Sequence, residues 1–186
     1  MYQQERSSFK KCDTKGVMIL ENHPADSRVK ISKDNVVQTL SSRMGTGGGN
    51  TPMMMENMVV RRLTPLECER LQGYPDGWTD IGDWIDSKGK TRKGEADSPR
   101  YKALGNSIAL PFWEWMAKRM AKYIESDKPT MASLFDGIGG FPLVYQRAGV
   151  EPVWASEIEE FPIAVTKKRF KGGYHEGDNR PLTEFD

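Results

Sequence analysis

Polar residues follow three strand-like segments near the carboxyl end of the sequence, where they could hold a nucleoside. Residues 133–141 read SLFDGIGGF, so Asp136 ends a strand-like run and three glycines follow within four residues. Glu157 ends the next such segment, and Asp178 follows the third. A glycine turn lets a ligand touch the backbone and directs free helix amides toward a carboxylate or phosphate. Because an acid at the second strand end can accept both hydroxyls of a ribose, the three features predict an adenosine pocket in which Asp178 meets the adenine amino group.

Alternating strands and helices are expected to position these groups. Hydrophobic patterning predicts strands at 132–135, 152–157 and 173–178, separated by helices at 141–148 and 161–170. This β-α-β-α-β order favours an α/β fold. Taken singly, the glycine loop and each acid are more typical of turns and exposed helix caps, so the predicted pocket depends on their occurring together.

Two helices are expected in the longer segment that precedes this unit. The sequence TPLECERLQG at 64–73 places Thr at the N-cap, Pro at the first helical position and Glu at the third, and it ends in Gly. Residues 107–125 have apolar spacing that predicts a helix of four or five turns. Asn106 and Ser107 belong to a polar loop before that helix, and capping its N-terminus is a sufficient role for them.

The remaining part of the chain before residue 130 is expected to be irregular. Strands are predicted at 15–22 and 35–42, followed by a glycine-rich loop at 43–52. Residues 79–99 are hydrophilic, with clusters of Lys, Gly and Asp, and predict a surface loop.

Composition limits the partners and the compartment. Hydrophobic residues make up 37% of the 186 residues and charged residues 28%, and the net charge of +1 gives no overall field that would attract a polyanion. Lys and Arg exceed Asp and Glu before residue 130, which favours a polyanion facing that part. Cys12 and Cys68 lie in dissimilar contexts, and His23 and His175 are isolated, so we expect no metal site. Without an apolar leader or a transmembrane run, a cytoplasmic location with no membrane contact is expected.

The stretch SLFDGIGGFPLVYQRAGVEPVWASEIEEFPIAVTKKRF (133–170) resembles the DNA cytosine-5 methyltransferases, which bind S-adenosyl-L-methionine. FDGIGG is similar to the first motif of that family and GDN at 177–179 to the third, although the family usually has Ile or Val where Asn179 stands. The resemblance implies that the adenine lies on an aromatic side chain, the ribose on an acid and the methionine portion along the glycine loop. The implied cofactor-binding residues in this part are Phe135, Asp136, Gly137, Ile138, Gly139, Gly140, Glu157, Ile158, Asp178 and Asn179.

Two further motifs of the same family are similar to segments before residue 130. RRLTPLECERLQGYPDGW (61–78) resembles the ninth motif, and GNSIALP (105–111) resembles the tenth, which completes the cofactor site in the family. The resemblance implies that Asn106 and Ser107 reach the methionine end of the cofactor.

Residues 21–52 resemble the end of the target-recognition region in phage- and bacterial-type members, which implies a bacterial or phage-infected cell as the setting. Double-stranded DNA would then lie near the glycine loop and its arginine, because Arg can bind guanine through two hydrogen bonds and glycines let the backbone approach phosphate. The implied DNA-binding residues are Arg43, Thr46, Gly47 and Gly48. A solvated surface loop is an equally open interpretation of these residues.

The motifs occur in an order that differs from the family's, in which the glycine loop comes first and motifs nine and ten come last. This order implies a circular permutation joined at ESDKPT, directly before Met131, because the termini of a doubly wound domain often lie close together. We therefore expect an α/β, partial Rossmann-like S-adenosylmethionine-dependent methyltransferase fold, circularly permuted, with a small irregular N-terminal target-recognition remnant. The expected division is a DNA-facing segment at 1–58, the C-terminal methyltransferase motifs at 59–126 and the N-terminal cofactor-binding half at 127–186.

The catalytic motif of the family has no counterpart among these residues. In the family a Pro-Cys thiolate attacks carbon 6 of a flipped cytosine, and neither that motif nor the Glu-Asn-Val and Gln-x-Arg motifs occur here. Cys68 is expected to be a buried small residue and Cys12 lacks the Pro neighbour, so no catalytic residue is named. The sequence favours a component or partial form of a DNA (cytosine-5-)-methyltransferase of a restriction-modification type, either completed by a second polypeptide or truncated. The alternatives are a non-catalytic module that binds S-adenosylmethionine or DNA, and a decayed fragment.

Overall fold

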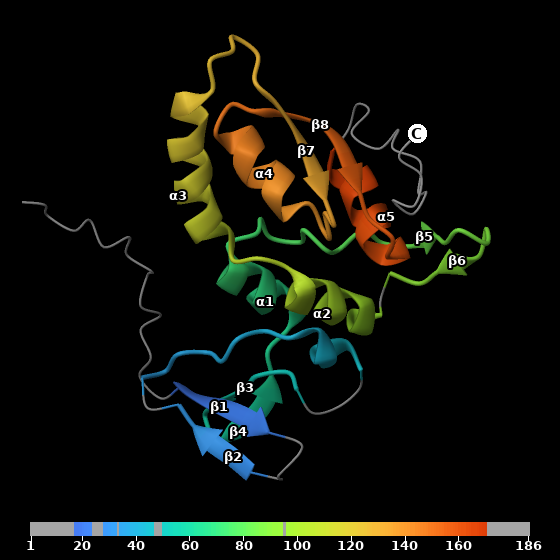
Figure 1. Ribbon diagram of the computed structural model, residues 1–186. Helices are drawn as coiled ribbons and strands as arrows, with labels where there is room; N and C mark the ends of the chain where they lie inside the picture. The colour runs from blue at the N-terminus through green and yellow to red at the C-terminus, as the bar shows by residue number, and fades with distance from the viewer. Residues whose placement is uncertain (1–16, 24–27, 33, 47–49, 95, 171–186) are drawn as a thin grey trace, which may run out of the picture.

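The computed structural model describes residues 17–23, 28–32, 34–46, 50–94 and 96–170. Figure 1 shows three groups of elements: a small antiparallel sheet, a pair of short helices, and a parallel strand pair with its helices. The described part is therefore a mixed α/β structure, in agreement with the predicted fold class. Several predictions lie outside the described residues, namely those for the strand at 173–178 and for Cys12, Gly47, Gly48, His175, Asp178 and Asn179.

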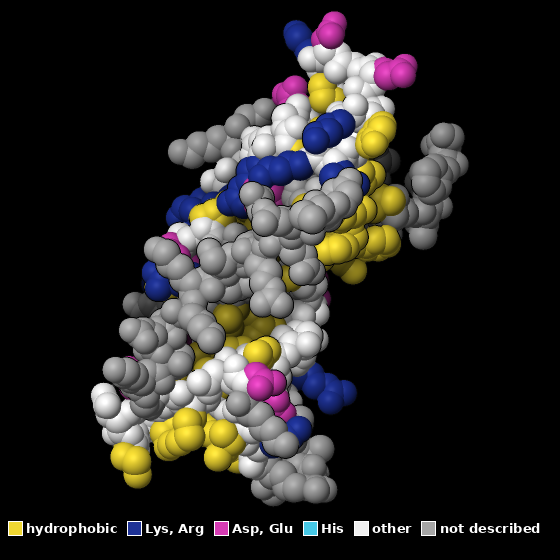
Figure 2. Space-filling model, turned by 90° about the vertical axis from the view of Figure 1, so that its left-hand side faces the viewer, with side chains coloured by type: hydrophobic (Ala, Val, Ile, Leu, Met, Phe, Trp, Pro, Cys, Tyr) yellow, Lys and Arg dark blue, Asp and Glu magenta, His cyan; other side chains and the backbone are white. Residues whose placement is uncertain are grey.

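The amino-terminal sheet has four antiparallel strands in the order β2-β1-β3-β4. Leu20 of the central strand lies opposite Ile31 on one side and Met53 on the other, so these apolar side chains share one face. Ile31 is 55% exposed, whereas Met54 on the opposite face packs against the core. Hydrophobic side chains are accordingly visible at the lower end of the molecule in Figure 2. The strands are β1 (Val17–His23), β2 (Arg28–Ile31), β3 (Met53–Glu56) and β4 (Val59–Arg62).

The strand predicted at 35–42 is wrong, because this segment packs against a helix and not against another strand. A Cβ on Gly105 would lie only 2.0 Å from the backbone oxygen of Ser41, so the two backbones are in close contact. Val37 and Leu40 pack against the hydrophobic core. Their apolar side chains produced the strand-like pattern in the sequence.

Helix α1 (Pro65–Gln72) begins and ends where the sequence predicts. The Thr64 hydroxyl accepts a hydrogen bond from the Glu67 N–H at 3.2 Å, and the Glu67 carboxylate accepts one from the Thr64 N–H at 2.8 Å, which completes a capping box. Gly73 ends the helix with φ of 82°. The Arg61 guanidinium bonds both Glu67 oxygens at 2.8 Å and, together with the bonds from Thr64, outweighs burial and lowers the pKa of Glu67 to about 2.

The lowered pKa of Glu67 predicts a pH-dependent contribution to stability. Because the pKa in the folded chain lies below the ordinary 4.5, the stabilisation is present above about pH 4.5 and is lost as pH falls through about 2. Glu67→Gln is expected to lower the free energy of unfolding by about 1–2 kcal/mol at pH 7. Urea unfolding at pH 7 and at pH 2–3 measures this difference, which should shrink at the lower pH. Glu125→Gln, in the exposed linker, is the control, and an equal effect of both substitutions at pH 7 would contradict the prediction.

Residues 79–99 are more ordered than the predicted surface loop. Strands β5 (Trp84–Ile85) and β6 (Thr91–Arg92) form a hairpin. The Asp86 side chain is 1% exposed and accepts hydrogen bonds from two backbone amides of the turn and from the Arg92 guanidinium. Hydrophobic periodicity cannot detect strands of two residues, so the sequence predicts only a polar loop here. The buried Asp86 carboxylate holds the turn of the hairpin.

The helix predicted at 107–125 is confirmed over 110–120, and a helix that the sequence did not predict precedes it. Helix α2 (Asp97–Asn106) ends at Ser107, whose backbone is extended, and α3 (Leu110–Met120) begins three residues later. A 3₁₀ turn, η2 (Ala121–Tyr123), follows α3. Asn106 and Ser107 therefore end α2, and the prediction that they cap the following helix is wrong.

Up to residue 170, where the described part ends, the carboxyl-terminal unit has the predicted order of strands and helices, with boundaries within two residues. Strands β7 and β8 pair in parallel, with Ser133 opposite Ala155. The helix between the two strands is the crossover connection that a parallel pair requires, and a second helix follows the second strand. The elements are β7 (Thr130–Leu134), α4 (Gly140–Arg147), β8 (Glu151–Ser156) and α5 (Glu160–Arg169).

The segments before and after residue 130 share one hydrophobic core. Helix α3 lies against α4, where the rings of Trp113 and Phe141 meet edge to face with centroids 4.8 Å apart. Fully buried side chains come from both segments, among them Leu104, Leu110 and Val144. Among the described residues no helix has both the length and the apolar character needed to cross a membrane.

Candidate functional site

The glycine loop begins with an unusual aromatic residue directly after β7. Phe135 has φ of 53°, in the left-handed region that residues other than glycine rarely adopt, and its side chain is 77% exposed. Asp136 is buried, and its carboxylate accepts a hydrogen bond from the Ser133 hydroxyl at 2.7 Å. The Asp136 N–H donates to the Ser156 carbonyl at 2.9 Å, which joins this loop to the end of β8. An exposed aromatic held in a strained backbone at the end of a strand is typical of a ligand-binding position.

The three glycines of the loop meet different surroundings. Gly137 has φ of 58°, and a Cβ there would have no atom within 4 Å, so the space above it is open. A Cβ on Gly139 would lie 2.6 Å from the Phe170 ring, and one on Gly140 would lie 2.6 Å from the Tyr74 hydroxyl. The last two glycines therefore allow close packing, while the first leaves room for a ligand next to the backbone.

Glu157 follows β8 and reaches the glycine loop through its carboxylate. The Gly137 N–H donates to one carboxylate oxygen at 2.6 Å. The other oxygen accepts from the N–H groups of Ile158 at 2.7 Å and Glu159 at 2.9 Å. The side chain of Ile158 is 75% exposed. The two strand ends that the sequence predicts to share a site are thus directly bonded, and an acid lies beside the open space at Gly137.

Two segments from before residue 130 lie against the same loop. The Trp78 indole N–H donates to the Ile138 carbonyl at 2.8 Å. A Cβ on Gly140 would lie 2.8 Å from the Ile108 side chain. The structure therefore brings the GYPDGW turn and the GNSIALP segment to the glycine loop, although about 30 to 60 residues separate them in sequence.

The tenth-motif residues are placed differently from one another. Asn106 is the last residue of α2 and its side chain is exposed. The Ser107 hydroxyl shares a 2.5 Å hydrogen bond with the Tyr74 hydroxyl, which lies next to Gly140. The Tyr74 side chain therefore lies between Ser107 and the glycine loop, and it connects the two.

Two aromatic residues of this site were not singled out in the sequence. Trp78 and Tyr74 are buried, and their rings lie 5.7 Å apart. Burial raises the pKa of the Tyr74 hydroxyl well above its ordinary value, so this group stays protonated and able to donate a hydrogen bond. The sequence feature that could have pointed to them is the presence of two aromatic residues beside Gly and Pro in the predicted turn GYPDGW.

Of the proposed DNA-facing residues that the structure describes, Arg43 lies on a short 3₁₀ turn and Thr46 directly after it, which corrects the prediction of a loop from residue 43. The turn is η1 (Ser42–Gly45), and Arg43 is exposed on it. The Thr46 hydroxyl donates to the Arg43 carbonyl at 2.8 Å. The Ser98 hydroxyl of α2 donates to the Gly45 carbonyl, so the turn is anchored on that helix.

The described cysteine has the environment of a structural residue. Cys68 is fully buried on α1. Burial, together with the nearby charges of Glu67 and Glu69, raises the pKa of its thiol to about 12. It is therefore protonated at neutral pH and out of reach of a substrate. Among the described residues, no three His, Cys, Asp or Glu side chains are grouped so that they could hold a metal ion.

Hydrophobic side chains are also exposed along α3. Phe112 and Trp115 are 57% and 54% exposed, and Tyr123 of the following turn η2 is 85% exposed. The Arg119 guanidinium lies over the Trp115 ring, 4.7 Å from its centroid. In Figure 2 hydrophobic and basic side chains lie next to each other at the height of this helix. Contiguous exposed apolar surface of this kind is typical of a contact with another polypeptide.

The family model for C-5 cytosine-specific DNA methylase matches residues 3–122 and 130–186, which together make up most of the chain. The chain is also similar to the Type II methyltransferase M.Bsp6I of Bacillus sp. (strain RFL6), at 36% identity over 94 residues, covering 50% of this chain and 26% of that protein. The Type II methyltransferase M1.ScrFI of Lactococcus lactis subsp. cremoris is 30% identical over 90 residues, covering 48% and 20%.

A third relative is named a DNA N-6-adenine-methyltransferase, from Escherichia phage P1. It is 40% identical over 87 residues, which cover 36% of this chain and 11% of that protein. The matches to these three relatives thus cover about a quarter or less of each relative's length.

Proposed function

Because the chain belongs to the C-5 cytosine-specific DNA methylase family, we propose that it is the cofactor-binding component of a DNA (cytosine-5-)-methyltransferase. The observation that carries this proposal is the meeting of distant segments at one loop. Glu157 bonds the Gly137 amide, while Trp78 bonds the Ile138 carbonyl and Ile108 packs at Gly140. A ligand at the glycine loop would therefore contact both parts of the chain.

S-adenosyl-L-methionine is the proposed ligand, and the described residues fit it in three respects. The open space at Gly137 accepts a group next to the backbone, the exposed Phe135 ring offers a face for a base, and Glu157 offers carboxylate oxygens for ribose hydroxyls. Asp136, Gly139 and Gly140 would line the methionine portion, with Asn106 and Ser107 beside it. When bound, the cofactor supplies the methyl group for carbon 5 of cytosine. Ile138 and Ile158 would complete the pocket, with Asp178 and Asn179 at the adenine.

Double-stranded DNA is the proposed substrate. The exposed Arg43 projects from a turn that is fixed on α2, so its guanidinium is presented from a rigid base. Thr46 is exposed beside it. Gly47 and Gly48 would let the phosphate backbone approach the loop.

The proposed architecture is a circularly permuted, Rossmann-like half of a methyltransferase. The parallel pair β7–β8 with α4 corresponds to the start of such a fold, and α3, which precedes it by a short linker, packs on α4. This arrangement is what a joint before Met131 requires. The proposed division remains a DNA-facing segment at 1–58, the ninth and tenth motifs at 59–126 and the cofactor half at 127–186.

A second polypeptide is proposed to supply the Pro-Cys, Glu-Asn-Val and Gln-x-Arg motifs. The sequence has no Pro-Cys pair, and the buried, protonated Cys68 cannot replace its thiolate. Parallel sheets are normally covered on both faces, whereas Leu134 of β7 and Val153 of β8 are 53% and 51% exposed. The exposed strand pair and the aromatic residues of α3 are the surfaces on which such a partner would pack.

Reconstitution tests the proposed function. The purified chain is mixed with a polypeptide that carries the missing motifs, duplex DNA and cofactor labelled in its methyl group. Transfer of label to cytosine is expected from the mixture and from neither protein alone. Absence of transfer from two folded proteins that both bind DNA would refute the enzymatic role. Retained cofactor binding in that case would favour the alternative, a non-catalytic module that binds S-adenosylmethionine or DNA.

A further inference from the structure

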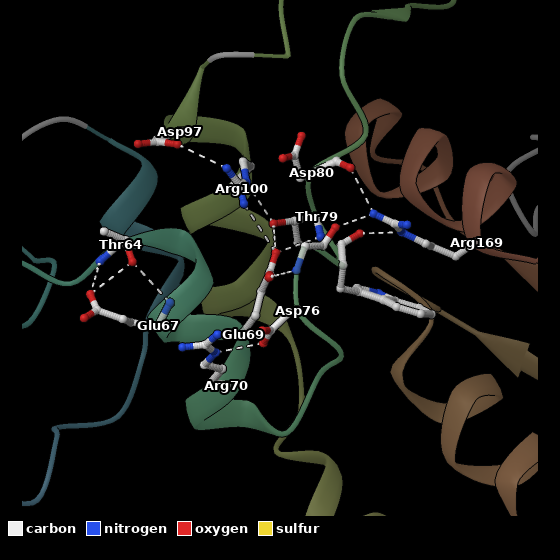
Figure 3. Close-up of polar contacts among 12 residues, drawn as sticks. Thr64, Glu67, Glu69, Arg70, Asp76, Thr79, Asp80, Asp97, Arg100 and Arg169 are labelled. Atoms are coloured by element: carbon white, nitrogen blue, oxygen red, sulfur yellow. Dashed lines mark hydrogen bonds and ion pairs between the residues drawn. The ribbon is translucent and has the colours of Figure 1, made fainter. Parts of the chain in front are cut away.

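The turn that carries Trp78 is held by a buried carboxylate on one side. Glu69 of α1 has no exposed surface and accepts hydrogen bonds from the Gly77 N–H at 2.7 Å and the Thr79 N–H at 2.8 Å. The Thr79 hydroxyl donates to the same carboxylate at 2.5 Å, and the Arg100 guanidinium of α2 lies 3.5 Å away. Figure 3 shows these groups converging on the turn. The amides of the turn are thus fixed by the α1–α2 pair.

A guanidinium holds the other side of the same turn. Arg169, near the end of α5, donates to the carbonyls of Trp78 at 2.8 Å and Asp80 at 2.9 Å, and also to the carbonyl of Gly77 (Figure 3). Lys168 donates to the Ile81 carbonyl at 2.7 Å. The amides of the turn are therefore held by Glu69 of α1, and its carbonyls are held by Arg169 and Lys168 of α5.

The clamped turn contacts the glycine loop through one directional bond. The Trp78 indole N–H donates to the Ile138 carbonyl, and this bond is buried. A peptide unit is planar, so fixing the direction of that carbonyl also fixes the direction of the Gly139 N–H. The Gly139 N–H in turn donates to the Asp136 carbonyl at 3.1 Å. The orientation of the peptide group in the middle of the loop thus depends on Trp78.

We propose that Trp78 is a positioning residue that sets the backbone of the glycine loop for cofactor binding, with Glu69 and Arg169 holding it in place. The claim that the positioned loop binds S-adenosylmethionine rests on the proposed function. The positioning itself concerns the free protein and depends only on the bonds described above. Through Glu69, Arg100 and α2, the same contacts link the loop to the turn that carries Arg43.

Trp78→Phe separates the directional bond from packing. Phenylalanine keeps an aromatic ring against Tyr74 and Phe170, whose centroids lie 5.7 Å and 5.9 Å from that of Trp78, but it has no N–H to donate. Trp84→Phe is the matched control, because Trp84 also packs edge to face on a phenylalanine, Phe161, at 5.7 Å. Both substitutions remove an equal volume, from within the core at Trp78 and from the half-buried side chain that packs against it at Trp84.

Hydrogen–deuterium exchange of the free protein, followed on peptides that span 136–143, is the first measurement. Trp78→Phe is expected to raise the exchange rate in this region about 5- to 10-fold, because one buried hydrogen bond is lost. Trp84→Phe should leave the exchange rate near the parent value. Arg169→Lys keeps the charge but replaces the planar guanidinium, which donates from two nitrogens, by a single nitrogen, and it should change exchange in the same direction. The proposal is overturned if Trp78→Phe and Trp84→Phe show equal exchange in this region. It is also overturned if neither Trp78→Phe nor Arg169→Lys differs from the parent protein.

The affinity for S-adenosylmethionine is the second measurement, made by calorimetry on the same proteins. Trp78→Phe should weaken binding about 5- to 10-fold and leave the affinity for duplex DNA unchanged. The parent protein and Trp78→Phe could differ in exchange as expected while the parent binds no cofactor. This result would refute the proposed function and leave the positioning role intact. Altered exchange in Trp78→Phe with unchanged cofactor affinity would overturn the role of that positioning in binding.

Discussion

Glu157→Ala is expected to abolish binding of S-adenosyl-L-methionine, with a loss of affinity of about 100-fold or more. The substitution removes the acceptor proposed for two ribose hydroxyls, and each hydrogen bond to a charged group contributes about 1.5–3 kcal/mol. It also removes the 2.6 Å bond that holds the Gly137 amide at the end of β8. Isothermal titration calorimetry of the purified variant with the cofactor measures the effect.

Two further variants separate the proposed role of Glu157 from general effects. Glu151→Ala removes the same charge from the opposite end of β8 and should leave the affinity unchanged. Glu157→Gln keeps one acceptor oxygen and should bind with an intermediate affinity. Retention of parent affinity within a few-fold by Glu157→Ala would show that the ribose does not lie on this carboxylate.

Glu69→Ala is expected to lower the free energy of unfolding by about 3–5 kcal/mol. The carboxylate has no exposed surface, and its removal leaves the Gly77 and Thr79 amides and the Thr79 hydroxyl without their acceptor, next to the charge of Arg100. A loss of this size is a large part of the stability of an ordinary domain. Urea unfolding followed by tryptophan fluorescence measures it, and the variant should also release the turn that carries Trp78.

An exposed ion pair between the same helix and the turn that follows it provides the comparison for Glu69. Arg70 and Asp76 lie 2.5 Å apart, but their side chains are 59% and 58% exposed, so Asp76→Ala should change the urea midpoint little. Figure 3 shows Arg70 on α1 and Asp76 in the turn that follows this helix. Similar midpoints for Glu69→Ala and Asp76→Ala would contradict the clamp described for this turn.

The carboxyl-terminal unit was predictable because its signals are local and mutually consistent. Runs of apolar residues separated by glycine turns predict β7, α4, β8 and α5 within two residues of their observed bounds. Helix α1 was equally accessible, since Thr64 and Glu67 form the capping box that their spacing predicts. Each of these elements is specified by residues within a few positions of its ends.

The elements that the sequence did not predict depend on distant contacts. The segment at 35–42 is apolar because it packs on α2, and Gly105 allows that approach. The β5–β6 hairpin depends on the buried carboxylate of Asp86. In a stretch rich in charged residues, the sequence does not show which carboxylate is buried. Helix α2 begins within the hydrophilic stretch 79–99 that predicts a loop, and its buried residues Ala103 and Leu104 belong to the shared core. Neither propensity nor periodicity contains this information.

The candidate site shows the same division. The sequence locates Glu157 and the glycine loop, and the structure joins them by a hydrogen bond. The contribution of Trp78 was not predicted, because its partner, the Ile138 carbonyl, is a backbone atom 60 residues away. The cofactor role of these residues remains a prediction from the family and from the geometry of the loop.

Titration of the folded chain with S-adenosyl-L-methionine is the most direct test of the claim that both segments enclose one adenosyl ligand. We expect saturable binding of one cofactor per chain, together with a rise in the urea midpoint as the ligand concentration increases. A chain that unfolds cooperatively yet takes up no cofactor, with no shift of its midpoint, would contradict it.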